Sequence, residues 1–163
     1  MMVGFESANQ RVLDQVYRKG IKVSNMLPFC EQAKQAGLSI FGYFMIGAPT
    51  ETLKECKKTI DLAFMLPIDE ATFSIATPLP ETGLAEFATA IAPDKSISFS
   101  RLDYYTATGA ISDIPAFRLR WLQRIAFLKF YLHPRRFKFL VNVAKSPASI
   151  RKGILKLKRI VTI

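Results

Sequence analysis

The chain has 163 residues, of which half are hydrophobic and 12% are aromatic, and its formal net charge is +10. This composition fits one domain with a real core and excludes wholesale disorder. The longest apolar stretches are short and carry charges, and the N-terminus lacks a basic segment followed by an apolar one. We therefore expect no membrane span and no export signal, and a cytoplasmic location.

The charge is unevenly distributed. Residues 1–100 contain 9 Lys and Arg against 11 Asp and Glu, whereas residues 101–163 contain 14 Lys and Arg against two Asp. The first part is therefore nearly neutral and the second carries a net +12. The two cysteines, Cys30 and Cys56, are far apart in predicted apolar helix stripes, so we interpret both as buried thiols.

The first predicted elements are a strand, a helix and a second helix. Residues 3–5 indicate the end of a buried strand. Asn9 is expected to cap a short helix that buries Val12, Leu13 and Val16 and ends at Gly20. Ser24 is expected to cap the next helix, which Gly37 stops. The apolar stripe predicted for this second helix consists of Met26, Phe29, Cys30 and Ala33.

A second strand is predicted at 38–47, where the apolar run LSIFGYFMIG is typical of a parallel strand covered on both faces. Thr52 and Glu55 form a capping-box pattern for a helix that Pro67 ends. The segment ATFSIAT at 71–77 predicts a third strand. This alternation of strands and helices indicates an α/β fold with a parallel sheet.

Residues 93–113 are polar and rich in turn formers, which predicts an irregular connector. The chain reads as helical from Ile114, with Pro134 ending one helix and Pro147 beginning the last. That last helix would place apolar and basic side chains on opposite faces. We therefore divide the chain into residues 1–92, the connector 93–113 and a basic helical tail at 114–163.

Three loops follow the predicted strands, at 6–9, 47–51 and 77–83. In parallel βα folds, functional groups lie on loops at the carboxyl ends of strands. Gly47 permits a tight turn or a close approach to a ligand. Glu51 is expected to point into its loop, or else to favour the helix N-terminus through the dipole. Glu6, directly after a buried strand, needs a partner or water.

Three segments carry a resemblance to a known family: GFESANQRVLDQVYRKG, GLSIFGYFMIGAPTETLKECKKTIDLA and FSIATPLPETGL. They resemble the second half of a radical S-adenosylmethionine (SAM) core domain, in the variety found behind a cobalamin-binding domain. The resemblance covers about residues 3–90. It implies half of a parallel βα barrel followed by a basic helical tail.

The resemblance also implies a SAM site at the three loops. The first loop would lie near the SAM ribose and methionine, the second beside the adenine, and the third near adenine or substrate. Ala8 and Glu81 depart from the family's glycines. The implied cofactor-binding residues are Glu6, Ser7, Met45, Ile46, Gly47, Glu51, Thr77 and Pro78, with Pro80 beside them.

The family's iron–sulfur motif, CxxxCxxC, is absent from this chain. A [4Fe–4S] cluster needs thiolate ligands, and two remote cysteines cannot assemble one. We assign no catalytic and no metal-binding residue, and we expect His133 to be a capping or surface residue. The chain is therefore expected to be the C-terminal part of a longer protein, whose missing N-terminal half carries the cluster and in which cobalamin can also take part.

Two functions remain open. One is the SAM-facing part of a radical SAM enzyme, active only in the full-length or reassembled protein, on a small or lipid-like substrate. The other is a non-catalytic remnant whose basic helices contact a membrane surface or a partner. The same helices can instead cover the protein's own core. Nucleic acid is disfavoured, because the aromatic residues are spaced for packing rather than for base stacking.

Overall fold

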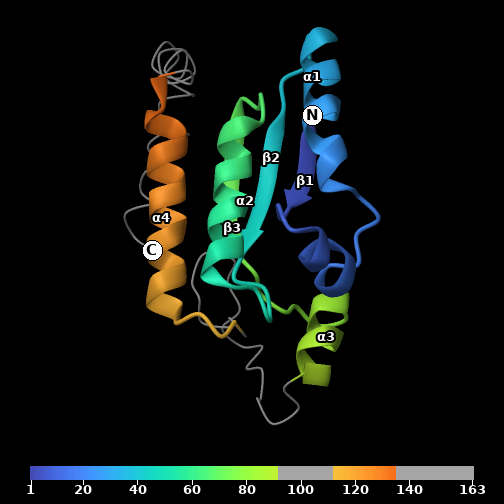
Figure 1. Ribbon diagram of the computed structural model, residues 1–163, viewed down its shortest axis with the longest axis vertical. Coiled ribbons are helices and arrows are strands. Elements are labelled where there is room, and N and C mark those ends of the chain that lie inside the picture. Colours follow the sequence, from blue (N-terminus) through green and yellow to red (C-terminus); the bar gives the residue numbers. More distant parts are fainter. Residues whose placement is uncertain (92–111, 135–163) are drawn as a thin grey trace.

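The computed structural model describes residues 1–91 and 112–134. Strands and helices alternate along the first part of the chain, and a long helix forms the second part (Figure 1). The elements in chain order are β1 (Met2–Glu6), η1 (Val12–Val16), α1 (Val23–Gln35), β2 (Phe41–Ile46), α2 (Leu53–Met65), β3 (Glu70–Ile75), α3 (Gly83–Ile91) and α4 (Ala116–Leu132).

The three strands form one parallel sheet in the order β1-β2-β3. This confirms the predicted α/β fold with a parallel sheet. Strands β2 and β3 pair in a regular register, from Phe41 opposite Glu70 to Ile46 opposite Ile75. The pairing of β1 with β2 is irregular, because the register shifts between Gly4 and Glu6. This bulge lies where β1 meets its loop, and bulges re-aim side chains next to functional sites.

Two helix signals in the sequence are confirmed. The Thr52 hydroxyl accepts a hydrogen bond from the Glu55 amide, and the Glu55 carboxylate accepts one from the Thr52 amide, which together make a capping box at α2. Gly37 follows α1 with φ +75°. The amide of Leu38 then reaches back to the Ala33 carbonyl at 3.0 Å, as in a Schellman motif.

Other helix ends differ from the predictions. Asn9 directly precedes the helical residues that lead into η1, but its side chain makes no capping bond, and η1 ends at Val16 rather than at Gly20. Lys22 precedes α1, so Ser24 lies within the helix instead of capping it. At the start of α1, the Val23 amide donates to the Gln10 side chain at 3.0 Å, so a residue from the preceding helical turn takes the place of a local cap.

Three further differences concern the apolar stripe of α1 and the second half of the chain. Phe29 of α1 is 40% exposed, whereas Met26, Cys30 and Ala33 are buried. Helix α3 was not predicted, and α4 begins at Ala116, two residues later than expected. The predicted end of α4 at Pro134 is confirmed. Most of the predicted connector and the helix after Pro147 lie outside the described residues.

The core lies on one face of the sheet. Phe5, Phe44 and Phe73 come from the three strands, and their rings follow one another at centroid distances of 5.4 and 5.6 Å. Phe127 and Phe130 of α4 pack edge-on against Phe73. Helix α4 therefore belongs to the same hydrophobic core as the sheet, and it lies beside β3 and α2 in Figure 1.

The opposite face of the sheet is covered less completely by the described residues. Tyr43 is 37% exposed there, and Met45, Thr72 and Ser74 are only partly buried. Residues 38–47 were expected to form a strand covered on both faces, whereas in this part of the chain only one face is packed under helices. We call the less covered side, defined by Tyr43, Met45, Thr72 and Ser74, the open face.

Helix α4 also closes the outer edge of β3. The Gln123 amide donates to the Phe73 carbonyl at 2.7 Å, and the Tyr131 hydroxyl donates to the Ala71 carbonyl at 2.8 Å. These bonds satisfy backbone groups that an edge strand would otherwise leave unpaired. Among the described residues, no helix is both long and apolar enough to cross a membrane.

Candidate functional site

The three loops after the strands lie at the carboxyl end of the parallel sheet, as predicted. Each contains a non-glycine residue with a left-handed backbone: Glu6 (φ 62°), Thr50 (φ 63°) and Glu81 (φ 61°). Such residues are uncommon, and a β-branched residue such as Thr50 is especially strained there. Strained residues gather at ligand-binding and catalytic sites. This edge is therefore the candidate site.

Glu6 pairs with a lysine that the sequence reasoning did not identify. The Glu6 carboxylate is 2.6 Å from the Lys19 ammonium, and Glu6 is only 9% exposed. A Cβ atom at Gly4 would lie 2.5 Å from the Glu6 carboxylate oxygen. Gly4 therefore leaves the room that this ion pair occupies. The expectation that Glu6 needs a partner is confirmed.

Ser7 is fully buried and ties the first loop to α2. Its hydroxyl lies 3.3 Å from the Thr59 hydroxyl and accepts a hydrogen bond from the Asn9 amide at 3.1 Å. The Asn9 side chain in turn donates to the Glu55 carbonyl. These contacts position the backbone of the first loop against α2.

Glu51 folds back onto its own loop. It is 2% exposed, and its Oε2 atom accepts hydrogen bonds from the amides of Gly47 (2.7 Å) and Ala48 (3.0 Å). Glu51 points into the loop, as the first of the two interpretations predicted. Its Oε1 atom has no hydrogen-bond partner of good geometry in the described part of the chain. The nearby Cys56 thiol nevertheless favours the charged form of the Glu51 carboxylate.

The pKa of Glu51 is raised, because burial disfavours the carboxylate more strongly than its hydrogen bonds favour it. Those bonds come from the Ala48 amide, the Cys56 thiol and the Gly47 amide. Glu51 thus stabilises the second loop by accepting hydrogen bonds from its backbone. It also holds its proton more tightly than an exposed glutamate does.

Gly47 and Ile46 serve packing. Gly47 has φ +77°, and a Cβ atom there would lie 2.7 Å from the side chain of Leu119 in α4. The described structure therefore places a side chain of α4 in close approach to this glycine. Ile46 is buried on the helix-covered face, whereas Met45 lies on the open face and is half-buried.

The third loop contains Thr77 and Pro78, which are both buried, and Pro80, which is exposed. The Thr77 hydroxyl donates to the Ile75 carbonyl at 3.1 Å. Thr82 accepts a hydrogen bond from the Ala85 amide and so begins α3. The sequence TPLPETG is thus a loop at the sheet edge that leads into a short helix.

Sequence reasoning missed two further residues, Tyr17 and Arg11. The Tyr17 hydroxyl is buried and has no hydrogen-bond partner among the described residues. Its pKa is raised by burial and by the carboxylates of Glu51 and Glu6. Arg11 bonds to the Thr50 hydroxyl and carbonyl, and to Glu55 at 2.9 Å. Neither residue directly follows a strand, so position alone gave no signal.

A small apolar cluster holds the three loops together. Val12 and Val16 of η1 meet Ala48 of the second loop, and the cluster continues to the end of the sheet and to α3. The Ala76 amide also donates to the Ile46 carbonyl at 2.9 Å. Together with the contacts of Ser7 and Asn9 to α2, the cluster makes the three loops and their flanking elements one packed unit. Its remaining buried members are Ala76 and Leu84.

The residues present do not fit an iron–sulfur cluster. In residues 1–91 and 112–134, no group of three His, Cys, Asp or Glu side chains could hold a metal ion. Burial raises the pKa of Cys30 to about 11 and raises that of Cys56 as well. Both thiols are therefore protonated near neutral pH. The interpretation of both as buried thiols is confirmed.

No family model matches the chain. The chain is 36% identical over 135 residues to an uncharacterized methyltransferase of Pyrococcus horikoshii, which covers 81% of this chain and 28% of that protein. It is 27% identical over 96 residues to a provisionally named methylthiotransferase of Methanocaldococcus jannaschii, which covers 59% of this chain and 21% of that protein. The chain thus matches about a quarter of the length of these two relatives, and both names are compatible with a radical SAM type of relation.

Proposed function

We propose that the chain is the SAM-facing C-terminal part of a radical SAM enzyme, which cleaves SAM reductively only in a longer or reassembled protein. The single observation that carries this proposal is the packed unit of three loops at the carboxyl end of a parallel sheet, with Glu51 bracing the middle loop. This is the place where parallel βα folds bind ligands. It also coincides with all three segments that resemble the family.

The names of the two relatives support the same proposal, because transfer of a methyl or methylthio group commonly draws on SAM. The strained backbone at Glu6, Thr50 and Glu81 adds support, since strain of this kind gathers at functional sites. The iron–sulfur cluster that would reduce SAM has no ligands in the described residues, so it would be held by another part of the longer protein.

Within this site, the residues divide into those that face a ligand and those that support the loops. Glu6 with Lys19 and the half-buried Met45 are groups available to a ligand. The buried Tyr17 hydroxyl, which has no hydrogen-bond partner among the described residues, is a third. An orphaned buried hydroxyl costs free energy unless something bonds to it. Ser7, Ile46, Gly47, Glu51, Thr77 and Pro78 would act by shaping the loops around SAM.

The unfinished edge of the sheet supports a preceding half-barrel. Among the described residues, no hydrogen bond joins the backbone of Met2, Val3 or Gly4 to a group outside the sheet. An edge of this kind can pair with another strand. We propose that the part of the longer protein that carries the cluster pairs here, so that the open face becomes the inside of a partial barrel.

The test uses the full-length protein that contains this chain, purified without oxygen and reconstituted with iron and sulfide. SAM binding is measured by equilibrium dialysis, and 5′-deoxyadenosine formation is measured with a chemical reductant. Glu51→Ala removes the acceptor of two backbone hydrogen bonds, so we expect SAM binding or cleavage to fall about tenfold or more. Glu31→Ala, at an exposed carboxylate of α1, serves as the matched control and should leave both unchanged.

Two results would count against the proposal, at different levels. If the folded Glu51→Ala protein binds and cleaves SAM like the parent, the assignment of the second loop is wrong. If the full-length protein binds neither SAM nor an iron–sulfur cluster, the family assignment is wrong. Far-UV circular dichroism of each variant separates loss of the site from loss of the fold.

A further inference from the structure

Helix α4 has a second apolar side that faces solvent. Its inner side packs on β3, yet its outer side also presents large apolar residues, Phe117 (62% exposed), Trp121 (61%), Leu128 (46%) and Leu132 (70%). Their spacing of 4, 7 and 4 residues places them on one stripe of the helix. A surface helix normally carries polar residues there. We call this stripe the outer face of α4.

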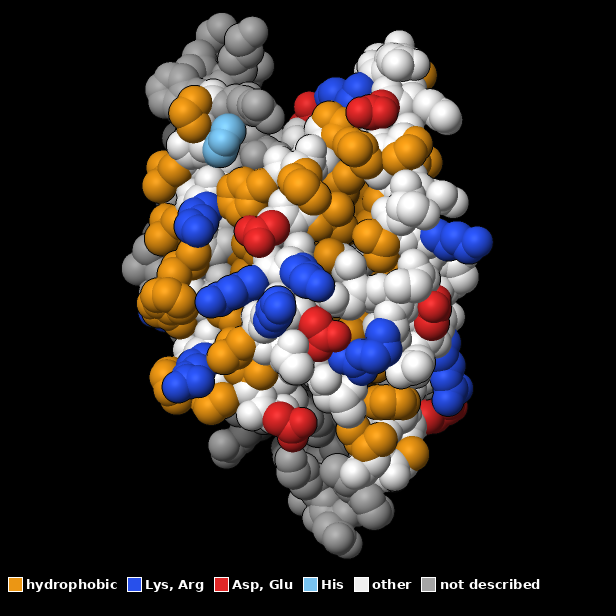
Figure 2. All heavy atoms as spheres, viewed as in Figure 1, with side chains coloured by type: hydrophobic (Ala, Val, Ile, Leu, Met, Phe, Trp, Pro, Cys, Tyr) orange, Lys and Arg blue, Asp and Glu red, His pale blue; other side chains and the backbone are white. Residues whose placement is uncertain are grey.

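Basic residues flank the outer face. Helix α4 contains Arg118, Arg120, Arg124 and Lys129 and no Asp or Glu. None of these four cations forms an ion pair within the described part of the chain. The Arg118 guanidinium lies 5.8 Å from the centre of the Phe117 ring. In Figure 2, hydrophobic side chains run along the α4 side of the molecule with Lys and Arg side chains among them.

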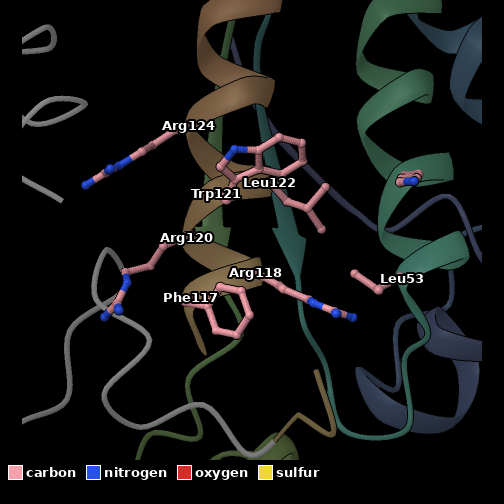
Figure 3. Close-up of a pocket in the computed structure, with 8 residues that line it drawn as sticks. Leu53, Phe117, Arg118, Arg120, Trp121, Leu122 and Arg124 are labelled. Atoms are coloured by element: carbon pink, nitrogen blue, oxygen red, sulfur yellow. The ribbon is translucent and has the colours of Figure 1, made fainter. Parts of the chain in front are cut away.

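The outer face borders an open pocket of about 610 Å³ that is lined mainly by α4, with Leu53 and Lys57 from α2. Four cationic side chains and no acidic one line this pocket. Figure 3 shows Arg118 reaching towards Leu53 of α2, while Arg120 and Arg124 point to the other side of the helix. Cations therefore stand on both sides of Trp121 and Phe117. They are placed to bind phosphates that lie around an inserted aromatic ring.

We propose that the outer face of α4 docks on the surface of an anionic lipid bilayer. Tryptophan and other aromatic residues favour the membrane interface, and arginines beside them contact lipid phosphates. The charge favours this occupant, because four cations without an ion pair in the described part of the chain would oppose docking on a neutral or basic partner. Leu128 and Leu132 favour lipid over nucleic acid, which has no apolar surface to cover them. This inference does not depend on the proposed function.

The sole tryptophan of the chain lies at the centre of the proposed contact, so its fluorescence reports on this face alone. The full chain is titrated with vesicles of three parts phosphatidylcholine to one part phosphatidylglycerol, and with vesicles of pure phosphatidylcholine. We expect a blue shift of Trp121 emission, and quenching by brominated lipid, with the anionic vesicles only. High salt should weaken the binding.

Two pairs of variants test the face itself. Arg120→Gln should weaken partitioning about fivefold, the share expected of one charge near an anionic surface, whereas Lys22→Gln at the start of α1 should leave it unchanged. Phe117→Ala should weaken it about tenfold, whereas Phe29→Ala, at an exposed ring of α1, should not. Thermal unfolding of each variant shows whether the fold is intact.

Other outcomes would overturn the proposal. Residues 135–163 are strongly basic and can themselves bind anionic vesicles. If vesicles sediment with the chain while Trp121 emission stays unchanged, the membrane contact lies elsewhere than on the outer face of α4. If an oligonucleotide shifts Trp121 emission as strongly as anionic vesicles do and displaces them, the face binds nucleic acid. Equal binding to neutral vesicles would remove the role of the arginines.

Discussion

The two edges of the sheet differ in how this chain completes them. At β3, side chains of α4 bond to the outer backbone groups, with Gln123 on Phe73 and Tyr131 on Ala71. At β1, no described side chain takes the corresponding groups of Met2, Val3 or Gly4. Within the part that the structure describes, the chain therefore closes its own β3 edge and leaves the β1 edge free to pair with another strand.

This difference bears on the candidate site. The Glu6–Lys19 ion pair lies at the end of the unfinished strand, where the register of β1 shifts. Glu51 and its loop lie one strand further in, where the pairing with β3 is regular. The Glu6–Lys19 pair thus lies on the side of the sheet that needs a partner, whereas Glu51 lies on the side that is already packed.

The largest effect should come from the packing of β3 against α4. Phe73→Ala removes a ring that contacts Phe44, Phe127 and Phe130, and we expect it to lower the free energy of unfolding by about 3–5 kcal/mol. Phe5→Ala is the matched change on β1. Since Phe5 stacks on Phe44 alone among these rings, its loss should cost about 1–2 kcal/mol less. Urea denaturation measures both, and equal losses would contradict the difference between the edges.

The next effect concerns the edge hydrogen bonds. Gln123→Met keeps the volume of the side chain but leaves the Phe73 carbonyl without its partner, which should cost about 1–2 kcal/mol. Part of this cost is offset, because Gln123 Oε1 has no partner of its own in the described structure. Tyr131→Phe should cost about 1 kcal/mol. If neither variant changes the urea midpoint, α4 does not close the β3 edge.

Glu51 should give the loop unit a distinct pH dependence. Its folded-state pKa is raised above the ordinary value of 4.5, so the folded chain holds this proton more tightly than the unfolded chain. The Glu51 contribution to the free energy of unfolding should therefore rise as the pH falls from the raised pKa to 4.5, and level off below it. Glu51→Gln should abolish that contribution while keeping an acceptor for the two amides.

The difference between parent and Glu51→Gln, measured by urea denaturation from pH 4 to pH 8, isolates this group. Glu55 acts in the opposite direction. The pKa of Glu55 is lowered, because hydrogen bonds from Thr52 and Arg11 outweigh its burial, so its stabilisation is lost in acid. A flat difference across the range would mean that Glu51 is not held as a buried brace.

The sequence predicted the elements whose signals are local. The strand alternation, the capping box of Thr52 and Glu55, and the stop at Gly37 depend on residues within a few positions of one another. Helix α3 was missed because its start, Thr82 and Gly83, reads as the end of a turn-rich loop. Asn9 was expected to cap a helix, but its side chain bonds to Glu55 instead, 46 positions away.

The placement of the three loops at one edge of the sheet was predicted, whereas the contacts that their residues make were not, for the same reason. The position of Glu51 before a capped helix indicated that it would point into its loop. The contact of Gly47 with Leu119 depends on a helix 72 positions further along, so no local pattern could separate packing from ligand approach. Lys19 and Tyr17 reach the sheet edge from the segment after η1, where sequence alone assigns them no role.

The smallest effect on stability should come from the open edge itself. Met2 is 76% exposed at the start of β1, so Met2→Lys should change the free energy of unfolding by less than about 0.5 kcal/mol. It should still reduce self-association of the isolated chain, because a lysine on an edge strand discourages pairing with a second copy. Light scattering across a concentration series measures this, with Leu38→Lys as a control at an exposed residue outside the strands.

If the chain is monomeric at every concentration, or if Leu38→Lys acts as strongly as Met2→Lys, the β1 edge is not a pairing surface. The proposal that a preceding half-barrel pairs there would then lose its structural basis.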